Sequence, residues 1–263
     1  MIKSILKQIL PVSWIFHSNH CYGRIRYFLR KDKKSQDILV LSFPKCGRTW
    51  IRVLLAKYFS EKNNVSFELN ITKMGGPSIL FSHDQKVINR FKNKKIIFLF
   101  RDPRDTIVSF YHHCFHREET FSGSIDDFVL SPLSGTDFIL HYYNSLWSKY
   151  KNYPKHLKLG FFYENLRKNT FNEMKQFLEF IGEEIDEKAL LKAIEYSSFD
   201  KLKKSERDGS IKAKTILGSK KKEENAYKVR KGKVGGYREE LSAKSIAHVE
   251  KKIKKILRIK YYK

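Results

Sequence analysis

Three apolar runs of strand length, each followed by a helix-like pattern, most limit what this chain can fold into. The runs are DILVLSF (37–43), KKIIFLF (94–100) and LKLGFFY (157–163). Apolar runs of this length without polar–apolar alternation indicate buried strands, and a repeated strand–helix order indicates a parallel sheet with helices on both faces. We therefore predict an α/β fold, a single domain with a central parallel sheet flanked by helices.

Helix signals follow these runs. After the first run, Trp50, Leu54 and Tyr58 recur at helical spacing, and after the second, Asp102 and Pro103 are typical of a helix start. In such sheets ligands bind beyond the carboxyl ends of the strands, so the residues after each run are candidate site residues. Elsewhere we expect loops through 61–93, a tyrosine-rich helix over 136–151, a long loop over 205–232 that closes over a ligand, and a last helix from about Glu239 to Leu257.

Charge and cysteine content indicate which partners and which structural classes the sequence favours. The chain has 53 Lys and Arg against 28 Asp and Glu, a formal charge of +25, which favours anionic partners. Three scattered cysteines are too few for a disulfide framework or a tetrahedral metal site, and no apolar run reaches the roughly 18 residues of a membrane span. We predict a cytoplasmic protein. Its basic N-terminal arm (1–30) suits peripheral contact with an anionic membrane, a solvated arm being the alternative.

The stretch FPKCGRTW joins the first run to its helix. Backbone N–H groups at a helix N-terminus favour an anion, and Lys45, Arg48 and Thr49 add charge and a hydroxyl around the turn at Gly47. The ring of Trp50 either stacks on a nucleobase or packs inward. This pattern predicts a P-loop-like nucleotide-binding fold. Lys45 precedes Gly47, however, whereas the Walker pattern ends in GK[ST], so an ordinary ATP or GTP hydrolase is disfavoured.

Two segments resemble a known family. FPKCGRTW is similar to the YPKSGTTW loop that binds the 5′-phosphosulfate of 3′-phosphoadenylyl sulfate (PAPS) in the cytosolic-type sulfotransferases. FLFRDPRDTIVSFYHH is similar to the segment whose Arg and Ser contact the 3′-phosphate, and Arg101 and Ser109 occupy those places. For the first segment, the resemblance implies nucleotide contacts at Lys45, Cys46, Gly47, Arg48, Thr49 and Trp50.

Three weaker matches follow in the family's order. FFYENL resembles FYEDM, SSF resembles TSF, and VRKGKVGGY resembles RKGxxGDW, so the resemblance spans about Asp37 to Leu241. The first two motifs imply adenine contacts and the third a 3′-phosphate contact. The residues so implied are Tyr163, Ser197, Ser198, Phe199, Arg230, Lys231 and Gly232.

The chemistry of the family needs a base for the acceptor proton and a cation for the leaving phosphate. ILFSHDQ resembles the KTHLP segment, which implies that His83 is the base. Lys45 is the natural cation, and Ser109 is the third residue expected to carry catalysis. Asp84, next to His83, is a candidate for orienting its ring.

Several positions depart from the family pattern. Cys46 replaces Ser and Arg48 replaces Thr in the loop, while Phe81 stands where KTHLP has its Lys, which removes one positive contact to the transferring group. Gly236 and Tyr237 replace the Asp and Trp that follow RKG. The interval between Lys45 and His83 is also short for the cytosolic enzymes of animals, which thins the acceptor-binding loops, so the resemblance leaves the acceptor unidentified.

The sequence thus predicts a PAPS-dependent sulfotransferase domain over 31–263. It would transfer a sulfuryl group to a hydroxyl (or an amine) of a small-molecule, carbohydrate or lipid acceptor and release adenosine 3′,5′-bisphosphate (PAP). No metal is expected: His112 and His116 lie one helical turn apart, but without an HExxH glutamate. No nucleic-acid partner is expected, and the oligomeric state stays open. The alternatives are a magnesium-dependent phosphotransferase of P-loop type and a polyanion- or nucleic-acid-binding protein driven by charge.

Overall fold

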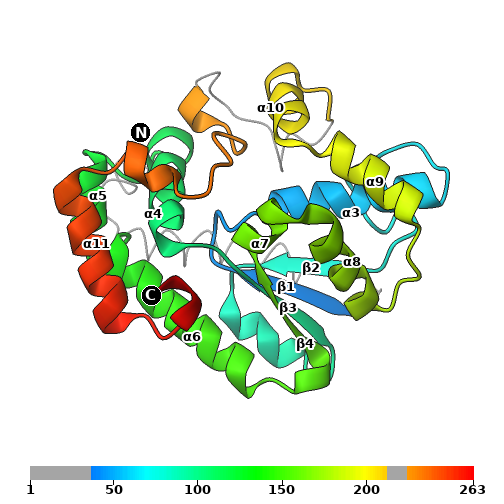
Figure 1. Cartoon of the computed structure of the whole chain (residues 1–263), viewed down its shortest axis with the longest axis horizontal. Helices are drawn as coiled ribbons and strands as arrows, with labels where there is room; N and C mark the ends of the chain where they lie inside the picture. The colour runs from blue at the N-terminus through cyan, green and yellow to red at the C-terminus, as the bar shows by residue number, and fades with distance from the viewer. Residues whose placement is uncertain (1–36, 212–223) are drawn as a thin grey trace, which may run out of the picture. The chain divides into compact units, whose positions relative to one another are not determined.

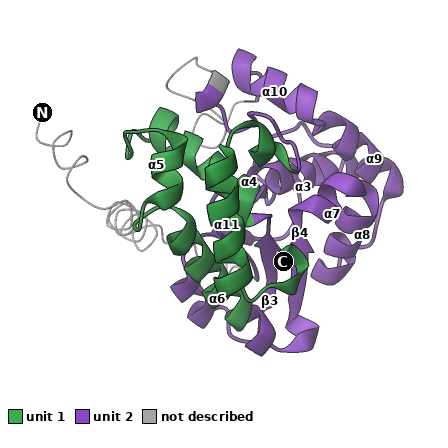
Figure 2. Ribbon diagram, turned by 60° about the vertical axis from the view of Figure 1, so that its left-hand side comes forward, with its two compact units in different colours: residues 1–35, 103–149, 235–263 green, residues 36–102, 150–234 purple. Residues whose placement is uncertain are grey.

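The computed structural model describes residues 37–211 and 224–263. The predicted arm (1–30), its membrane contact and the middle of the predicted long loop (212–223) lie outside the described residues. The chain divides into two compact units, coloured in Figure 2. One comprises 36–102 and 150–234, and the described part of the other comprises 103–149 and 235–263.

A four-stranded parallel sheet forms the centre of the first unit (Figure 1). Its strands, in spatial order, are β2 (Ile79–Ser82), β1 (Ile38–Ser42), β3 (Lys95–Phe100) and β4 (Lys158–Phe162). All three strands expected from the apolar runs are confirmed, and β1 is buried along its whole length. In β4, at the edge of the sheet, only Phe161 is buried, so the prediction of a buried strand is wrong there. The predicted α/β fold with a central parallel sheet is therefore confirmed.

The strand β2 lies in a segment that we expected to form loops. It is four residues long, pairs only with β1 and is half-buried throughout. A short strand at the edge of a sheet needs no continuous apolar run, because only one of its sides is paired and neither face is fully covered. The apolar run at β2, Ile79 to Phe81, is correspondingly too short to be recognised as a strand from the sequence.

Helices of the first unit follow or link the strands. The predicted helix after β1 and the helix that ends at Gly182 are confirmed as α3 and α8. Within this unit α7 and α8 contact β4, and α3 packs against α9. The α-helices are α3 (Arg48–Lys62), α7 (Tyr163–Lys168), α8 (Thr170–Ile181), α9 (Glu187–Tyr196) and α10 (Phe199–Asp208), and the short turns are η1 (Gln85–Arg90), η3 (Lys155–Leu157) and η4 (Glu224–Ala226).

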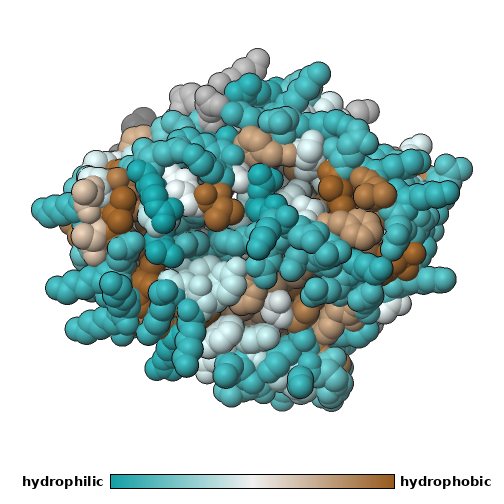
Figure 3. All heavy atoms as spheres, in the orientation of Figure 1, coloured by the Kyte–Doolittle hydropathy of each residue, from teal (hydrophilic) through white to brown (hydrophobic). Residues whose placement is uncertain are grey.

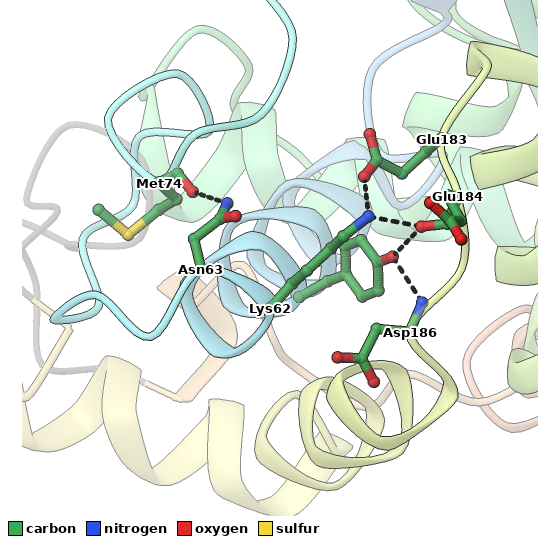
Figure 4. Close-up of polar contacts among 7 residues, drawn as sticks. Lys62, Asn63, Met74, Glu183, Glu184 and Asp186 are labelled. Atoms are coloured by element: carbon green, nitrogen blue, oxygen red, sulfur yellow. Dashed lines mark hydrogen bonds and ion pairs between the residues drawn. The ribbon is translucent and has the colours of Figure 1, made fainter.

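The C-terminal end of α3 is tied to the loop between α8 and α9 (Figure 4). Lys62 pairs with the carboxylate of Glu183 and donates to the carbonyl of Glu184 at 2.5 Å. The hydroxyl of Tyr58 donates to the same carbonyl and accepts from the backbone N–H of Asp186, both at 3.1 Å. These bonds fix the C-terminal end of α3, the helix that follows the loop containing Lys45 and Gly47.

The second unit is helical in its described part. The helix after β3 and the tyrosine-rich helix are confirmed as α4 and α6. The last helix begins later than predicted, because Ser242 caps it by accepting from the N–H of Ser245 at 3.2 Å. The elements are α4 (Pro103–His112), η2 (His113–Arg117), α5 (Ile125–Leu130), α6 (Thr136–Asn152), η5 (Gly236–Glu239), α11 (Ala243–Ile256) and η6 (Lys260–Tyr262).

Hydrophilic side chains dominate the face drawn in Figure 3, with apolar ones scattered among them. Such scattered apolar side chains are ordinary for a protein surface. Among residues 37–211 and 224–263, none of the helices combines the length and the apolar character needed to cross a bilayer. The large apolar side chains exposed there belong to Val65, Leu130, Leu133, Leu191, Val234 and Tyr261.

Candidate active site

The carboxyl edge of the sheet carries the candidate residues. β2 leads directly into His83, β3 into Arg101 and β4 into Tyr163, while β1 leads through Phe43 into the loop with Lys45. Neighbouring strands are in parallel register, with Ser42 opposite Leu99 and Phe100 opposite Phe162. Parallel strands in such register end together, and ligands in α/β folds bind at that edge.

The loop between β1 and α3 has an unusual backbone. Lys45 has φ 69° and Gly47, the N-cap of α3, has φ 98°. The first turn of α3 carries no acidic residue. Because a helix N-terminus presents backbone N–H groups and the positive end of the macrodipole, this loop suits an anion. The Cys46 side chain is fully buried, so a contact from this residue to a ligand would come from its backbone.

Arg101 joins three of the predicted motifs. Its Nη1 donates to the carbonyl of Lys45 at 3.0 Å, and its Nη2 lies 3.5 Å from the carbonyl of Lys233. Its guanidinium lies 4.5 Å from the ring centre of Tyr163, whose hydroxyl donates to the carbonyl of Gly232 at 3.3 Å. The loop after β1, the ends of β3 and β4 and the RKG motif therefore meet in one place.

Two glycines of these motifs lie against aromatic rings. A Cβ on Gly47 would lie 2.7 Å from the Tyr163 ring, and one on Gly232 would lie 2.4 Å from the Phe199 ring. Both glycines also have positive φ, 98° and 59°. A side chain at either position would meet a clash and an unfavourable backbone conformation together. These contacts bring Phe199, from the SSF motif, beside the RKG motif.

Trp50 links the loop to the SSF motif. Its Nε1 donates to the carbonyl of Ser197 at 3.0 Å, and its ring lies edge-on to Tyr163 with centroids 6.0 Å apart. The guanidinium of Arg167 lies 5.5 Å from the Trp50 ring centre. The hydroxyl of Ser197 is buried and donates to the carbonyl of Ile194 at 3.3 Å. The half-buried Trp50 thus positions this motif.

The imidazole of His83 has a defined partner at each nitrogen. Its Nδ1 lies 2.9 Å from the carbonyl of Ser42, which only accepts, so Nδ1 carries the proton. The Nε2 lone pair then accepts a hydrogen bond from Nη2 of Arg48, so the ring is neutral in this arrangement. Asp84, considered as the orienting residue, caps η1 by accepting from the N–H of Lys86 at 2.9 Å.

Two carboxylates that the sequence analysis did not single out support the site. Glu164 accepts from the N–H of Asp102, directly after Arg101, at 2.8 Å. The buried carboxylate of Glu206 accepts from the N–H groups of Lys228 and Val229, each at 2.8 Å, and so anchors the chain before the RKG motif. Glu164 lies within the FFYENL motif and could have been found there. Glu206 could not be found from the sequence, because its segment was predicted to be a loop and no motif includes it.

The remaining predicted contacts lie on α3, α4, the start of α10 and the RKG motif. Thr49 is half-buried in the first turn of α3, and Ser198 is the N-cap of α10. Arg230 is half-buried and Lys231 is exposed. Ser109 is half-buried on α4, in the second unit. Their roles as ligand contacts, and that of Ser109 in catalysis, stay predictions.

Within the described ranges, no three side chains of His, Cys, Asp or Glu cluster as metal ligands would. In the second unit, Nε2 of His112 lies 2.6 Å from the carboxylate of Glu240. The rings of His112 and His116 are stacked with centroids 5.4 Å apart. Within the histidine-rich segment HHCFH, His112 therefore pairs with a carboxylate far away in the sequence and stacks on His116.

Comparison with known proteins agrees with these motifs. The family model described as the sulfotransferase domain matches residues 35–260. Mouse sulfotransferase 6B1 is 30% identical over 180 residues, which are 57% of this chain and 56% of that protein's length. Bovine sulfotransferase 1E1 is 24% identical over 258 residues, 85% of each chain.

Solved structures share the fold. Mouse sulfotransferase SULT7A1 complexed with PAP superposes with a TM-score of 0.63 at 20% identity, covering 86% of each chain. Retinol dehydratase in complex with androsterone and the inactive cofactor PAP gives the same TM-score of 0.63 at 18% identity, covering 85% of this chain and 81% of that one. Identities this low establish the fold alone.

Proposed function

Because the chain belongs to the sulfotransferase domain family, we propose that it transfers a sulfuryl group from PAPS to a hydroxyl of a small-molecule acceptor. One observation carries this proposal: the carbonyls of Lys45 and Lys233 both lie at the guanidinium of Arg101. The loop suited to the 5′-phosphosulfate and the motif suited to the 3′-phosphate are thereby adjacent. A nucleotide phosphorylated at both ends of its ribose needs this adjacency.

In the proposed reaction the acceptor oxygen attacks sulfur as the bond from sulfur to the 5′-phosphate oxygen breaks. The hydroxyl proton passes to Nε2 of His83, whose Nδ1 proton is held by the carbonyl of Ser42. The electron pair of the broken bond stays on the 5′-phosphate of PAP, where the charge of Lys45 and the N-terminus of α3 stabilise it. Ser109 is assigned to the 3′-phosphate side by its place in the motif.

The acceptor is proposed only by class. One solved relative binds androsterone and another, also a retinol dehydratase, binds retinol, and both ligands are small apolar molecules with a hydroxyl. This supports a small apolar hydroxyl compound over the carbohydrate acceptor also expected from the sequence. A cytoplasmic location is proposed as well, on the basis of the scattered cysteines.

The test is transfer of ³⁵S from labelled PAPS to a panel of phenols, sterols, retinol, sugars and lipid head groups, with EDTA present. We expect labelled product from at least one small hydroxyl compound. Labelled phosphate transfer from ATP that requires magnesium would support the phosphotransferase instead. Binding of heparin and DNA alike, without labelled product and without PAP binding, would support the polyanion-binding alternative.

His83 is tested in the same assay. His83→Ala should retain PAP binding while kcat falls by about 10²- to 10⁴-fold, the usual contribution of a general base. His156→Ala is the matched control, because this imidazole is exposed on η3. Unchanged kcat in His83→Ala would reject His83 as the base.

A further inference from the structure

Two of the departures from the family pattern are complementary in charge. The resemblance places a Thr where this chain has Arg48 and a Lys where it has Phe81. The chain has thus lost a cation on β2 and gained one at the start of α3. The change at Phe81 removes one positive charge and the change at Arg48 adds one, so together they conserve the charge near His83.

The structure places the gained cation beside the proposed base. Arg48 is the first residue of α3, and its Nη2 donates to Nε2 of His83. The lone pair that would take the acceptor proton is therefore engaged by the guanidinium of Arg48 in this structure. A guanidinium also has a planar fork that suits the oxygens of a sulfuryl or phosphoryl group.

The position of Phe81 fits the same exchange. The guanidinium carbon of Arg52, one helical turn after Arg48, lies 4.5 Å from the centre of the Phe81 ring. Arg52 is half-buried, and this burial lowers the pKa of its guanidinium. An aromatic face stabilises such a cation, whereas a lysine at position 81 would add a second positive charge against it.

We propose that Arg48 takes the place of the missing lysine and also gates the base. When PAPS binds, its sulfuryl oxygens draw the Arg48 guanidinium away from Nε2, which frees this nitrogen for the acceptor hydroxyl. The acceptor oxygen then bonds to sulfur, its proton moves to Nε2 of His83, and the bond to the 5′-phosphate breaks with Arg48 on the sulfuryl oxygens. This proposal rests on the proposed function and adds that the base becomes available only after the donor binds.

Steady-state kinetics separates this role from a structural one. In Arg48→Thr, which restores the family residue, we expect PAP still to bind and kcat to fall about 10²-fold, as for loss of a preorganised charge at the transition state. Arg48→Lys should regain part of kcat, because it keeps the charge without the fork. Lys86→Thr, which removes an exposed cation three residues after His83, should match wild type.

A chemical probe tests the gate without an acceptor. Diethyl pyrocarbonate acylates the free lone pair of a neutral imidazole, and peptide mass spectrometry reports the rate at His83. We expect Arg48→Thr to raise this rate severalfold over wild type in the ligand-free protein, with Lys86→Thr unchanged.

Two outcomes would overturn the proposal while leaving the sulfotransferase function intact. One is a wild-type kcat in Arg48→Thr, and the other is an unchanged rate of His83 acylation in that variant. If the wild-type protein neither binds PAP nor transfers ³⁵S, the proposed function fails, and the role of Arg48 fails with it.

Discussion

At the scale of single residues, the candidate site depends on a glycine whose backbone conformation and close ring contact both disfavour a side chain. Gly47 combines φ 98° with a ring of Tyr163 that would lie 2.7 Å from a Cβ. Gly209, at the end of α10, has φ 71° but nothing within 4 Å of a Cβ. Comparing Gly47 with Gly209 separates two effects of adding a side chain: the unfavourable backbone conformation, present at both positions, and the steric clash, present at Gly47.

Gly47→Ala should therefore lose both stability and PAP affinity, whereas Gly209→Ala should lose stability alone. Both variants should lose about 1–2 kcal/mol of unfolding free energy from the left-handed backbone. Only Gly47→Ala should also displace Tyr163 and weaken PAP binding by at least about tenfold, or ~1.4 kcal/mol. Chemical denaturation and PAP titration measure the two effects. Equal PAP affinity in the two variants would show that the ring contact does not shape the nucleotide site.

At the scale of elements, α10 supports the RKG motif through one carboxylate. The two oxygens of Glu206 each accept one backbone N–H, those of Lys228 and Val229. A glutamine there would turn an NH₂ group toward one of these N–H groups and leave it without an acceptor. The motif after these residues would then lose its anchor.

We expect Glu206→Gln to weaken PAP binding about tenfold while the protein stays folded. Glu195→Gln, which changes an exposed carboxylate on α9, is the control and should bind PAP as wild type does. The measurement is PAP titration together with circular dichroism. Wild-type PAP affinity in Glu206→Gln would show that α10 does not support the nucleotide site through this carboxylate.

The end of α3 gives a prediction of pH dependence. The hydrogen bond to Glu183 raises the pKa of Lys62, so its contribution to stability is fully present below the lysine pKa of the unfolded chain, about 10.4, and is lost as pH rises through the higher folded pKa. Lys62→Met should lower the unfolding free energy by about 1 kcal/mol near neutral pH. The corresponding fall in Tm is about 2–4 °C. The difference from wild type should shrink above pH of about 10.4.

An exposed ion pair is the control for Lys62. The side chains of Lys73 and Glu68 are 61% and 55% exposed, against 26% and 23% for Lys62 and Glu183. Lys73→Met should therefore change Tm very little. A pH-independent loss in Lys62→Met would instead attribute its effect to packing of the lysine stem.

Elements could be predicted where the chain signals them locally. The strands β1, β3 and β4 and the helices α3, α4, α6 and α8 follow from apolar runs, apolar periodicity and caps such as Gly182. The edge strand β2 has no continuous burial to produce a signal, and α10 buries only Leu202 and Glu206. The pairing of Arg48 with His83 joins residues 35 positions apart, so only the fold reveals it.

At the scale of the whole molecule, the formal charge of +25 is compatible with several anionic partners. What distinguishes among them is specificity. A polyanion-binding protein would lose affinity steeply with salt and would not distinguish nucleotides. A site built from Arg101, Tyr163 and the RKG motif should instead require both phosphates of one nucleotide. The sulfotransferase family predicted from the ordered motifs is confirmed over residues 35–260.

The most direct test of a single site for both phosphates is calorimetric titration of the wild-type chain with PAP and with adenosine 5′-monophosphate, in moderate salt with EDTA. We expect one site for PAP and at least about tenfold weaker binding of the monophosphate, because each charged hydrogen bond to the 3′-phosphate contributes about 1.5–3 kcal/mol. Equal affinity for the two nucleotides, or PAP binding only when magnesium is added, would contradict a single site that holds the nucleotide by both phosphates.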